Sequence, residues 1–256
     1  MHKATYKTLF LFGFLFLFIS CKKGRQIVVK VTSKTIMIDS LLSSNSKIIE
    51  TISPYKEKMI AEINTVISFT PKDLVRTDGA LESSLGNLIA DLSYEKVNPI
   101  FFKKTGKTID FALFNYDGIR AGIPAGNVTN KNAFELMPFE NNYVVTKLKG
   151  EKIIEIINYL IKSNAAHPLS KQVKLTINNS KYKLKIKGKT FDQDQNYHVL
   201  TTNYLQSGGD NMLFFKNPIE LHNIEYKMRD AIVDHFKSID TLKSNLDGRF
   251  KRNKNG

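Results

Sequence analysis

The sequence predicts a mixed α/β fold in which helices pack against a mixed sheet. Three observations lead to this prediction. Apolar residues recur at helical spacing in several segments, most clearly over residues 150–164. Other segments are short and either continuously apolar or alternating, as β-strands are. The alternating segments 172–177 and 181–187 also flank the turn Asn178-Asn179-Ser180, which is typical of a hairpin. Helical and strand-like segments therefore interleave along the chain, and the class is α/β or α+β.

The first half of the chain is expected to alternate strands and helices. A strand rich in β-branched residues is predicted over residues 26–38, followed by a helix over residues 39–64 that Asp39 and Ser40 can cap. Pro54 should break or kink this helix, because proline removes a backbone hydrogen bond. The other elements predicted here are a strand near residues 66–69, a helix over residues 82–97 that ends before Pro99, and an apolar strand over residues 110–114. We expect that last strand to be buried on both faces.

The second half is predicted to contain further strands and helices around the hairpin. In order they are a helical turn over residues 130–137, a strand over 142–148, the helix over 150–164, the hairpin, a strand over 197–202 and a last helix over 225–239. Residues 251–256 form a basic tail, which we expect to fray. With 256 residues, 42% of them hydrophobic, the chain is long enough for one domain with a real core.

The first twenty residues have the composition of a signal peptide. A short basic head precedes a run of Leu and Phe that is too short to cross a bilayer comfortably but suits an apolar signal core. The run ends at Ser20-Cys21, and Cys21 is the only cysteine, so the segment resembles a bacterial lipoprotein signal. We expect residues 1–20 to be removed and Cys21 to be lipidated, giving a periplasmic lipoprotein of the cell envelope that a lipid anchor holds on the membrane. An uncleaved anchor or an ordinary signal peptide is the alternative.

The domain organisation that follows is a signal peptide (1–20), a tether with the first strand (21–38), one domain (39–250) and the basic tail (251–256). The formal net charge is +14, and +12 remains after residues 1–20 are removed. Such a charge suits anionic ligands or an anionic membrane surface, but the lysines are spread along the chain and mostly solvate it. No basic helix or recognised motif gathers them, which argues against a nucleic-acid partner.

Three short segments together carry the side chains that a nucleotide pocket needs. They are Asn115–Arg120, Met137–Asn141 and Tyr204–Asp210. Phe139 and Tyr204 offer rings for a base, and Arg120 offers a planar cation for phosphate. Asp210 can bind sugar hydroxyls, and Asn115 can bind the ligand or hold its turn. Gly208 and Gly209 allow a tight loop. Each motif also has a structural interpretation: a turn with a surface arginine, a core phenylalanine, and an aspartate that caps a turn.

The order and spacing of many segments resemble the C-terminal domain of the 5′-nucleotidase family, from about residue 40 to residue 250. Besides the three segments above, the resemblance includes residues 82–91, the segment Leu148-Lys149-Gly150 and the closing Asp247-Gly248-Arg249. It implies that Phe139 and Tyr204 sandwich the base, that Asp210 holds the ribose, and that Asn115 and Arg120 face the substrate. Two departures bear on phosphate binding. Tyr116 and Asp117 stand where relatives usually have glycines, and Leu81 stands where some relatives have a second arginine.

The metallophosphatase half that this family normally carries is not found in the sequence. Its dinuclear motifs, Asp-x-His, Gly-Asn-His-Asp/Glu and Gly-His-x-His, do not occur, and no two of the five histidines have the spacing of a ligand pair. No Gly-x-Ser-x-Gly motif occurs either. We therefore assign no catalytic residue, metal or cofactor to this chain, and expect divalent metals only in a partner.

These observations predict the nucleotide-recognition half of a 5′-nucleotidase-type phosphohydrolase of nucleotide catabolism and salvage, completed by a separate metallophosphatase chain. The alternatives are a standalone nucleotide- or nucleoside-binding lipoprotein without catalysis, and a relic whose pocket binds nothing.

Overall fold

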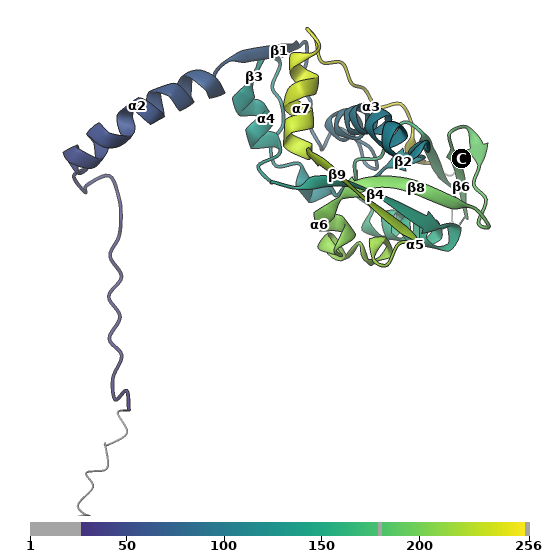
Figure 1. Cartoon of the computed structure of the whole chain (residues 1–256), viewed down its shortest axis with the longest axis horizontal. Helices are drawn as coiled ribbons and strands as arrows, with labels where there is room; N and C mark the ends of the chain where they lie inside the picture. Colours follow the sequence, from purple (N-terminus) through teal and green to yellow (C-terminus); the bar gives the residue numbers. More distant parts are fainter. Residues whose placement is uncertain (1–26, 179–180, 254–256) are drawn as a thin grey trace, which may run out of the picture. The chain divides into compact units, whose positions relative to one another are not determined.

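The computed structural model describes residues 27–178 and 181–253 of the chain (Figure 1). It divides into two compact units, residues 1–50 and residues 51–256. The predicted signal peptide and Cys21 lie outside the described residues. Within them, no helix combines the length and apolar character that a membrane crossing requires.

The predicted first strand is not formed. Residues 27–38 have no regular secondary structure and are exposed, Val29 to 90%. The β-branched residues there favour an extended backbone, but a strand also needs a neighbour to pair its amides and carbonyls, and no described residue pairs with this segment. The prediction of a strand here was therefore wrong.

The first described helix, α2, spans Ser46–Ile63 and begins later than predicted. Asp39 does not cap it. Its carboxylate instead accepts a hydrogen bond from the Leu41 amide (2.9 Å), within a separate turn. The amide of Ile48 donates to the Asn45 side chain (3.3 Å), which places the cap at Asn45. Pro54 lies inside the helix without ending it, so of the predicted break or kink the break was wrong. Because the helix is exposed on most sides, water can satisfy the carbonyl that the proline leaves free.

The central sheet has the strand order β2-β8-β4-β9, and this mixed sheet confirms the predicted fold class. Its strands are β2 (Phe111–Ala112), β8 (Asn196–Thr202), β4 (Asn142–Lys149) and β9 (Glu220–Lys227). β2 runs parallel to β8, whereas β4 is antiparallel to both β8 and β9. The strands β4 and β8 confirm the two predicted segments. The predicted strand over residues 110–114 is shorter in the structure, although its residues 111–114 are buried.

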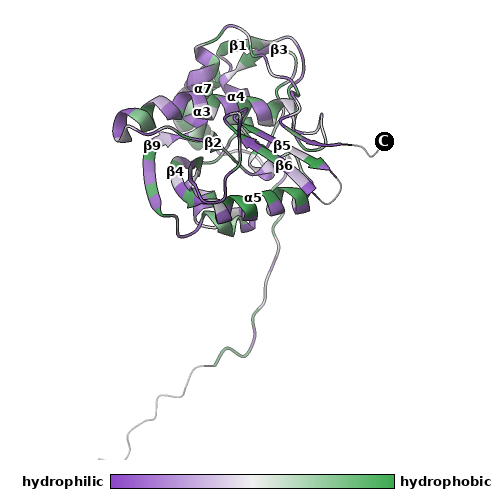
Figure 2. Cartoon of the chain, turned by 90° about the vertical axis from the view of Figure 1, so that its right-hand side faces the viewer, coloured by the Kyte–Doolittle hydropathy of each residue, from purple (hydrophilic) through white to green (hydrophobic). Residues whose placement is uncertain are grey.

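Helices cover both faces of the central sheet. In both views α3 (Ser84–Thr105) lies above the sheet and α5 (Gly150–Ser163) lies below it (Figures 1 and 2). Hydrophobic and hydrophilic residues alternate along α5 in Figure 2, as the predicted amphipathic pattern requires. α7 (Met228–Lys237) packs beside α3 and beside α4 (Asn130–Leu136). The core is the layer of fully buried Leu, Ile, Val and Phe side chains between these helices and the sheet.

Two helix boundaries differ from the prediction for identifiable reasons. α3 continues through Pro99 to Thr105, because Phe101 beyond the proline is fully buried and its packing outweighs one lost hydrogen bond. The predicted last helix begins three residues late, at Met228, since residues 225–227 belong to β9. The strand β9 was missed because Ile224 is its only buried residue, so its sequence shows no apolar alternation.

A second sheet has the order β10-β5-β6-β7, and we call it the basic sheet. Its strands are β5 (Val173–Asn178), β6 (Lys181–Ile186), β7 (Lys189–Thr190) and β10 (Phe250–Arg252). The register from Val173↔Ile186 to Asn178↔Lys181 confirms the predicted hairpin. The basic tail does not fray from Lys251 as predicted, because residues 250–252 add a parallel strand to β5. A small two-stranded sheet pairs β1 (Val66–Thr70) with β3 (Gly126–Thr129).

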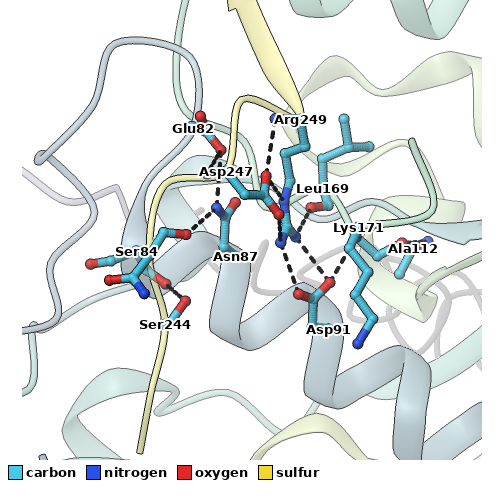
Figure 3. A network of polar contacts seen from close by, with 12 residues as sticks. Glu82, Ser84, Asn87, Asp91, Ala112, Leu169, Lys171, Ser244, Asp247 and Arg249 are labelled. Atoms are coloured by element: carbon cyan, nitrogen blue, oxygen red, sulfur yellow. Dashed lines mark hydrogen bonds and ion pairs between the residues drawn. The ribbon is translucent and has the colours of Figure 1, made fainter. Parts of the chain in front are cut away.

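A buried arginine ties the C-terminal segment to α3 (Figure 3). The Arg249 side chain is 4% exposed and donates to both carboxylate oxygens of Asp91 (2.9 Å each), to both of Asp247 (3.0 and 2.8 Å) and to the Leu169 carbonyl (2.9 Å). All five guanidinium N–H groups thus have acceptors. Glu82 reinforces the tie, since its carboxylate accepts from the Gly248 amide (2.8 Å) and from the Asn87 side chain (3.1 Å).

Candidate functional site

The fold brings the three predicted segments to one edge of the central sheet. Asn115 follows β2, and Tyr204 follows β8, in the short helix α6 (Asn203–Gln206). Because β2 and β8 are parallel, their carboxyl ends lie at the same edge, where ligands commonly bind in α/β sheets. A cavity of about 220 Å³ opens there, lined among others by Asn115, Arg120, Phe139, Tyr204 and Asp210. Its floor is apolar and includes Ile89, Phe114, Met137 and Met228.

Asp210 lies at the centre of the polar contacts in this cavity. One carboxylate oxygen accepts from the Asn115 side-chain amide (2.6 Å), and the other accepts from the Tyr204 hydroxyl (2.7 Å). The Asp210 carbonyl accepts from the Tyr159 hydroxyl (3.0 Å). Asp210 and Asn211 both have left-handed backbone conformations (φ 51° and 58°), which residues other than glycine seldom adopt. The contacts therefore hold a strained loop, a feature that is concentrated at functional sites.

The glycine pair before Asp210 has two different structural causes. Gly208 has φ +98°, which only glycine adopts without strain. Gly209 is required by close approach, because a Cβ atom there would lie 2.5 Å from two carbons of the Tyr204 ring. The loop is thus tight, as predicted, and Gly208 and Gly209 shape it. Neither glycine is among the residues that line the cavity.

Phe139 and Arg120 form another part of the cavity wall. The Phe139 ring is 38% exposed, and the Arg120 guanidinium lies 5.9 Å from its centroid, at the outer limit of a cation–π contact. The loop that carries Phe139 is held by Arg229, which donates to the Pro138 carbonyl (3.3 Å) and forms an ion pair with Glu140. Arg120 itself is exposed, and its nearest acceptor is the Asp117 carbonyl at 3.5 Å. Its charge is therefore available to a ligand.

The loop after Asn115 is enclosed by a second arginine that the sequence analysis missed. The Arg76 guanidinium stacks over the Tyr116 ring (4.3 Å) and forms an ion pair with Asp117 (3.1 Å). Asp117 lines the cavity, so this pair lies at its rim. Gly118 closes the loop, since a Cβ atom there would lie 2.7 Å from the Asn115 side-chain oxygen.

Two residues support the site from behind, and neither was singled out from the sequence. His167 is buried, and its Nδ1 accepts a hydrogen bond from the Tyr116 amide (3.1 Å). Burial lowers the pKa of His167, which favours the neutral ring that this acceptor role needs. Burial also raises the pKa of Tyr159, and the nearby Asp210 charge adds to this, so its hydroxyl remains a donor. Neither residue belongs to a sequence motif that would have pointed to it.

The chemistry that the arrangement offers is binding. It combines two partly exposed rings, an exposed guanidinium, and a carboxylate fixed by two donors. Over residues 27–178 and 181–253, no three His, Cys, Asp or Glu side chains are grouped so that they could hold a metal ion. The structure places Asn115, Arg120, Phe139, Tyr204 and Asp210 together, as the sequence predicted, whereas their contacts with a ligand stay predictions.

Comparison with known proteins identifies the same domain. Residues 60–217 match the family described as 5′-nucleotidase, C-terminal domain. A 5′-nucleotidase of Vibrio vulnificus is 26% identical over 196 residues, which are 73% of this chain and 33% of that protein. Protein UshA of Escherichia coli is 27% identical over 188 residues, or 70% of this chain and 32% of that protein. The chain thus spans about a third of the length of these curated relatives.

Solved structures agree with the sequence matches. A 5′-nucleotidase precursor from Thermus thermophilus superposes with a TM-score of 0.65 at 25% identity, covering 79% of this chain and 42% of that one. An NAD nucleotidase of Haemophilus influenzae has a TM-score of 0.54 at 17% identity, and covers 82% of this chain and 41% of that one. This second likeness concerns the fold alone.

Proposed function

Since the chain belongs to the 5′-nucleotidase C-terminal domain family, we propose that it is the nucleotide-recognition half of a 5′-nucleotidase-type phosphohydrolase. One observation carries the proposal. The Phe139 and Tyr204 rings, the Asp210 carboxylate and the Arg120 guanidinium all line one cavity at the carboxyl ends of β2 and β8. Such a set can stack a base, bind a sugar and bind a phosphate.

In the proposed complex the base lies between Phe139 and Tyr204. Two contacts hold the Tyr204 ring in place for this role. Gly209 lies against the ring, and the Tyr204 hydroxyl donates a hydrogen bond to the Asp210 carboxylate. Each carboxylate oxygen of Asp210 has one protein donor, and a carboxylate offers about four acceptor positions, so two remain for the ribose hydroxyls. Arg120 is exposed at the rim and binds the phosphate. A cavity of about 220 Å³ is smaller than the ~300–1,000 Å³ of typical ligand pockets, so the phosphate end stays open to solvent.

We further propose that a separate metallophosphatase chain supplies the hydrolytic chemistry and holds the divalent metals. The relatives named 5′-nucleotidases are about three times as long as the region that matches this chain. An enzyme must lower the activation barrier to phosphate ester hydrolysis by more than about 8 kcal/mol. In two-metal enzymes the metal pair activates the attacking water. Arg120 and Asp210 can position a substrate for such a centre. The enzyme so completed would act in nucleotide catabolism and salvage.

The binding proposal is tested by calorimetry with AMP and adenosine. Base stacking contributes about 1–3 kcal/mol on alanine substitution, so Phe139→Ala and Tyr204→Ala should each weaken binding about 5- to 150-fold. Phe102→Ala is the matched control, because that ring is 54% exposed on α3, outside the cavity. Unchanged affinity in the double variant Phe139→Ala/Tyr204→Ala would place any binding elsewhere.

The split-enzyme proposal is tested by assaying hydrolysis of AMP and UDP-sugars with added Mn²⁺, Zn²⁺ or Co²⁺. The purified chain should be inactive alone, and the cognate metallophosphatase chain should create activity that Arg120→Ala or Asp210→Ala lowers. Metal-dependent turnover by the isolated chain, abolished in Asp210→Ala, would contradict the proposal. AMP binding by the chain, with no activity created by the metallophosphatase chain, would instead favour a standalone nucleotide-binding protein.

The location of the protein is proposed from its N-terminal segment. The apolar run ending at Ser20-Cys21 supports a lipidated Cys21 that anchors the protein to the membrane on the periplasmic side. A single acyl chain anchors weakly, so more than one chain is expected on Cys21. Fractionation of cells that carry Cys21→Ser tests this proposal. If the variant remains in the membrane fraction as the wild type does, the lipoprotein assignment fails.

A further inference from the structure

The basic sheet presents a row of lysines on its outer side. In the β5–β6 pair, residues whose side chains are buried alternate with exposed ones, so Val173, Leu175 and Ile177 face inward. The outward positions of β6 are Lys181, Lys183 and Lys185, which pair with Asn178, Thr176 and Lys174 of β5. Lys251 of β10 pairs with Thr176 from the other side and is exposed. We call the outward side chains of Lys174, Lys181, Lys183, Lys185 and Lys251 the lysine face.

The charge of the lysine face is not compensated by its own sheet. The four strands together carry six lysines and one arginine, and no aspartate or glutamate. Among the described residues, no carboxylate forms an ion pair with any lysine of the face. Lys174 and Lys185 stand directly opposite each other, an arrangement that destabilises a sheet. Like charges therefore repel one another across the lysine face, as they would not on a surface that carries charges of both signs.

Two simpler explanations do not account for the whole pattern. Lysines often protect the edge strands of a sheet against pairing with other chains, and Lys181, Lys183 and Lys251 can do so, because β7 pairs only with Lys185 and Ile186 of β6 and β10 is an edge strand. Edge protection does not explain Lys174 and Lys185, which pair with each other inside the sheet. A face that only solvates the protein would mix charges of both signs. The repeated lysines thus indicate a partner with a negative surface.

The kind of partner follows from the chemistry of the face. It consists of lysines, whose compact, strongly hydrated charges suit diffuse attraction, whereas bidentate phosphate recognition favours arginine. No aromatic ring points outward between them on which a nucleic-acid base could stack: the outward residues are Thr176, Asn178 and Thr190 besides the lysines. The strands β5 and β6, which carry most of the face, lie side by side (Figure 2), so several of its charges can meet a flat surface at once. Next to it, Lys171, Lys174, Lys185 and Lys187 line a shallow hollow.

We propose that the lysine face docks the domain on a membrane surface of anionic phospholipids. Each lysine near such a surface strengthens binding about fivefold. Five lysines therefore act together as a second attachment, besides the proposed lipid anchor, and they hold the domain in one orientation. The attraction is electrostatic, so it weakens as salt shortens the screening length from about 10 Å at 0.1 M to about 3 Å at 1 M.

The test measures how fast each lysine of the full chain reacts with an acetylating reagent, by mass spectrometry. The chain is reconstituted in vesicles of phosphatidylcholine alone, or of equal parts phosphatidylcholine and phosphatidylglycerol. The lipid anchor proposed at Cys21 would hold it on both, so that only the contact of the domain differs. In anionic vesicles the lysine face should react at least about fivefold more slowly than in neutral ones. The internal controls are Lys162, Lys237 and Lys243, which are exposed and lie outside both four-stranded sheets, and their rates should not change.

Two matched triple variants distinguish the effect of the lysine face from the effect of the total charge. The variant Lys174→Gln/Lys183→Gln/Lys185→Gln should abolish the slowing at Lys181 and Lys251. The control Lys162→Gln/Lys237→Gln/Lys243→Gln removes the same charge. In this control, Lys181 and Lys251 should still react more slowly in anionic vesicles. Equal rates in the two vesicle types, or equal slowing of the three control lysines, would overturn the proposal. Protection by free inorganic phosphate in neutral vesicles would also overturn it, because the partner would then be a soluble anion.

Discussion

Two polar clusters of the domain serve different ends. Arg249 with Asp91 and Asp247 forms one, which we call the Arg249 cluster. Asp210 with Asn115 and Tyr204 forms the other, which we call the Asp210 cluster. Arg249 is 4% exposed, and each of its five N–H groups has an acceptor inside the protein (Figure 3). Among the described residues, the Asp210 carboxylate accepts from two side-chain donors, while Tyr204 beside it is 44% exposed. Arg120 is exposed at the rim, where its nearest acceptor is the Asp117 carbonyl at 3.5 Å. A polar cluster that is complete in itself stabilises the fold, whereas one that is left open can bind a ligand.

The largest effect is expected from Arg249→Met. The change leaves Asp91 (20% exposed) and Asp247 (45% exposed) without their cation. Breaking a fully buried ion pair costs about 3–5 kcal/mol, and because both carboxylates reach water we expect a loss at the lower end, about 3 kcal/mol. Urea unfolding should show a lower midpoint with an unchanged slope. Arg252→Met is the control, because Arg252 is exposed and should change stability by at most about 0.5 kcal/mol. Equal effects of the two changes would mean that the Arg249 cluster contributes no special stability.

A smaller effect, and on binding rather than folding, is expected from Gly209→Ala. The new methyl group would stand 2.5 Å from the Tyr204 ring, so the ring must leave its position and its bond to Asp210. Affinity for AMP should fall about 5- to 150-fold, as for loss of the ring itself. Gly188→Ala is the control, since that glycine also lies in a turn (φ +77°) but has no atom within 4 Å of the new methyl. Unchanged affinity for AMP in Gly209→Ala would show that the Tyr204 ring does not bind the ligand.

The smallest effect is a pH dependence at the Arg249 cluster. Burial alone would raise the pKa of Asp247, but the hydrogen bonds and charge of Arg249 outweigh it and hold the pKa below the usual 3.8. The folded-state pKa is therefore lower than the unfolded one. The stability that Asp247 adds is complete above about pH 5, well above the unfolded-state pKa, and is lost as the pH falls through the folded-state value.

This dependence is measured as the difference in unfolding free energy between the wild type and Asp247→Asn. The difference should be constant from neutral pH to about pH 5 and should shrink on further acidification. A difference that grows as the pH falls would have the opposite sign and would refute the assigned cause.

The sequence predicted those parts that depend on local pattern. The amphipathic helix over residues 150–164, the hairpin, and the strands β4 and β8 all have periodic sequences, and the structure confirms them. β9 has no such period, because it is mostly exposed, so no sequence pattern predicted it. The segment 26–38 has strand-like residues but no partner in the described chain, and pairing partners cannot be read from local pattern.

The residues of the site were likewise predicted only in part. Spacing and resemblance pointed to Asn115, Arg120, Phe139, Tyr204 and Asp210, and the fold brings these five to one cavity. Arg76, Tyr159 and His167 were missed because they act through contacts between segments far apart in the chain, such as the bond from Tyr159 to Asp210. A single arginine, tyrosine or histidine has no pattern that reveals such a contact.

The most direct test of the contrast between the clusters is urea unfolding with and without AMP. A ligand at 100 times its Kd stabilises the folded state by about 2.7 kcal/mol. The wild type and Arg249→Lys should gain the same stabilisation from AMP, although Arg249→Lys starts from a lower value. The double variant Phe139→Ala/Tyr204→Ala should gain little at the same AMP concentration. If that double variant gains as much as the wild type, or if Arg249→Lys loses the gain, the assignment of binding to one cluster and stability to the other is contradicted.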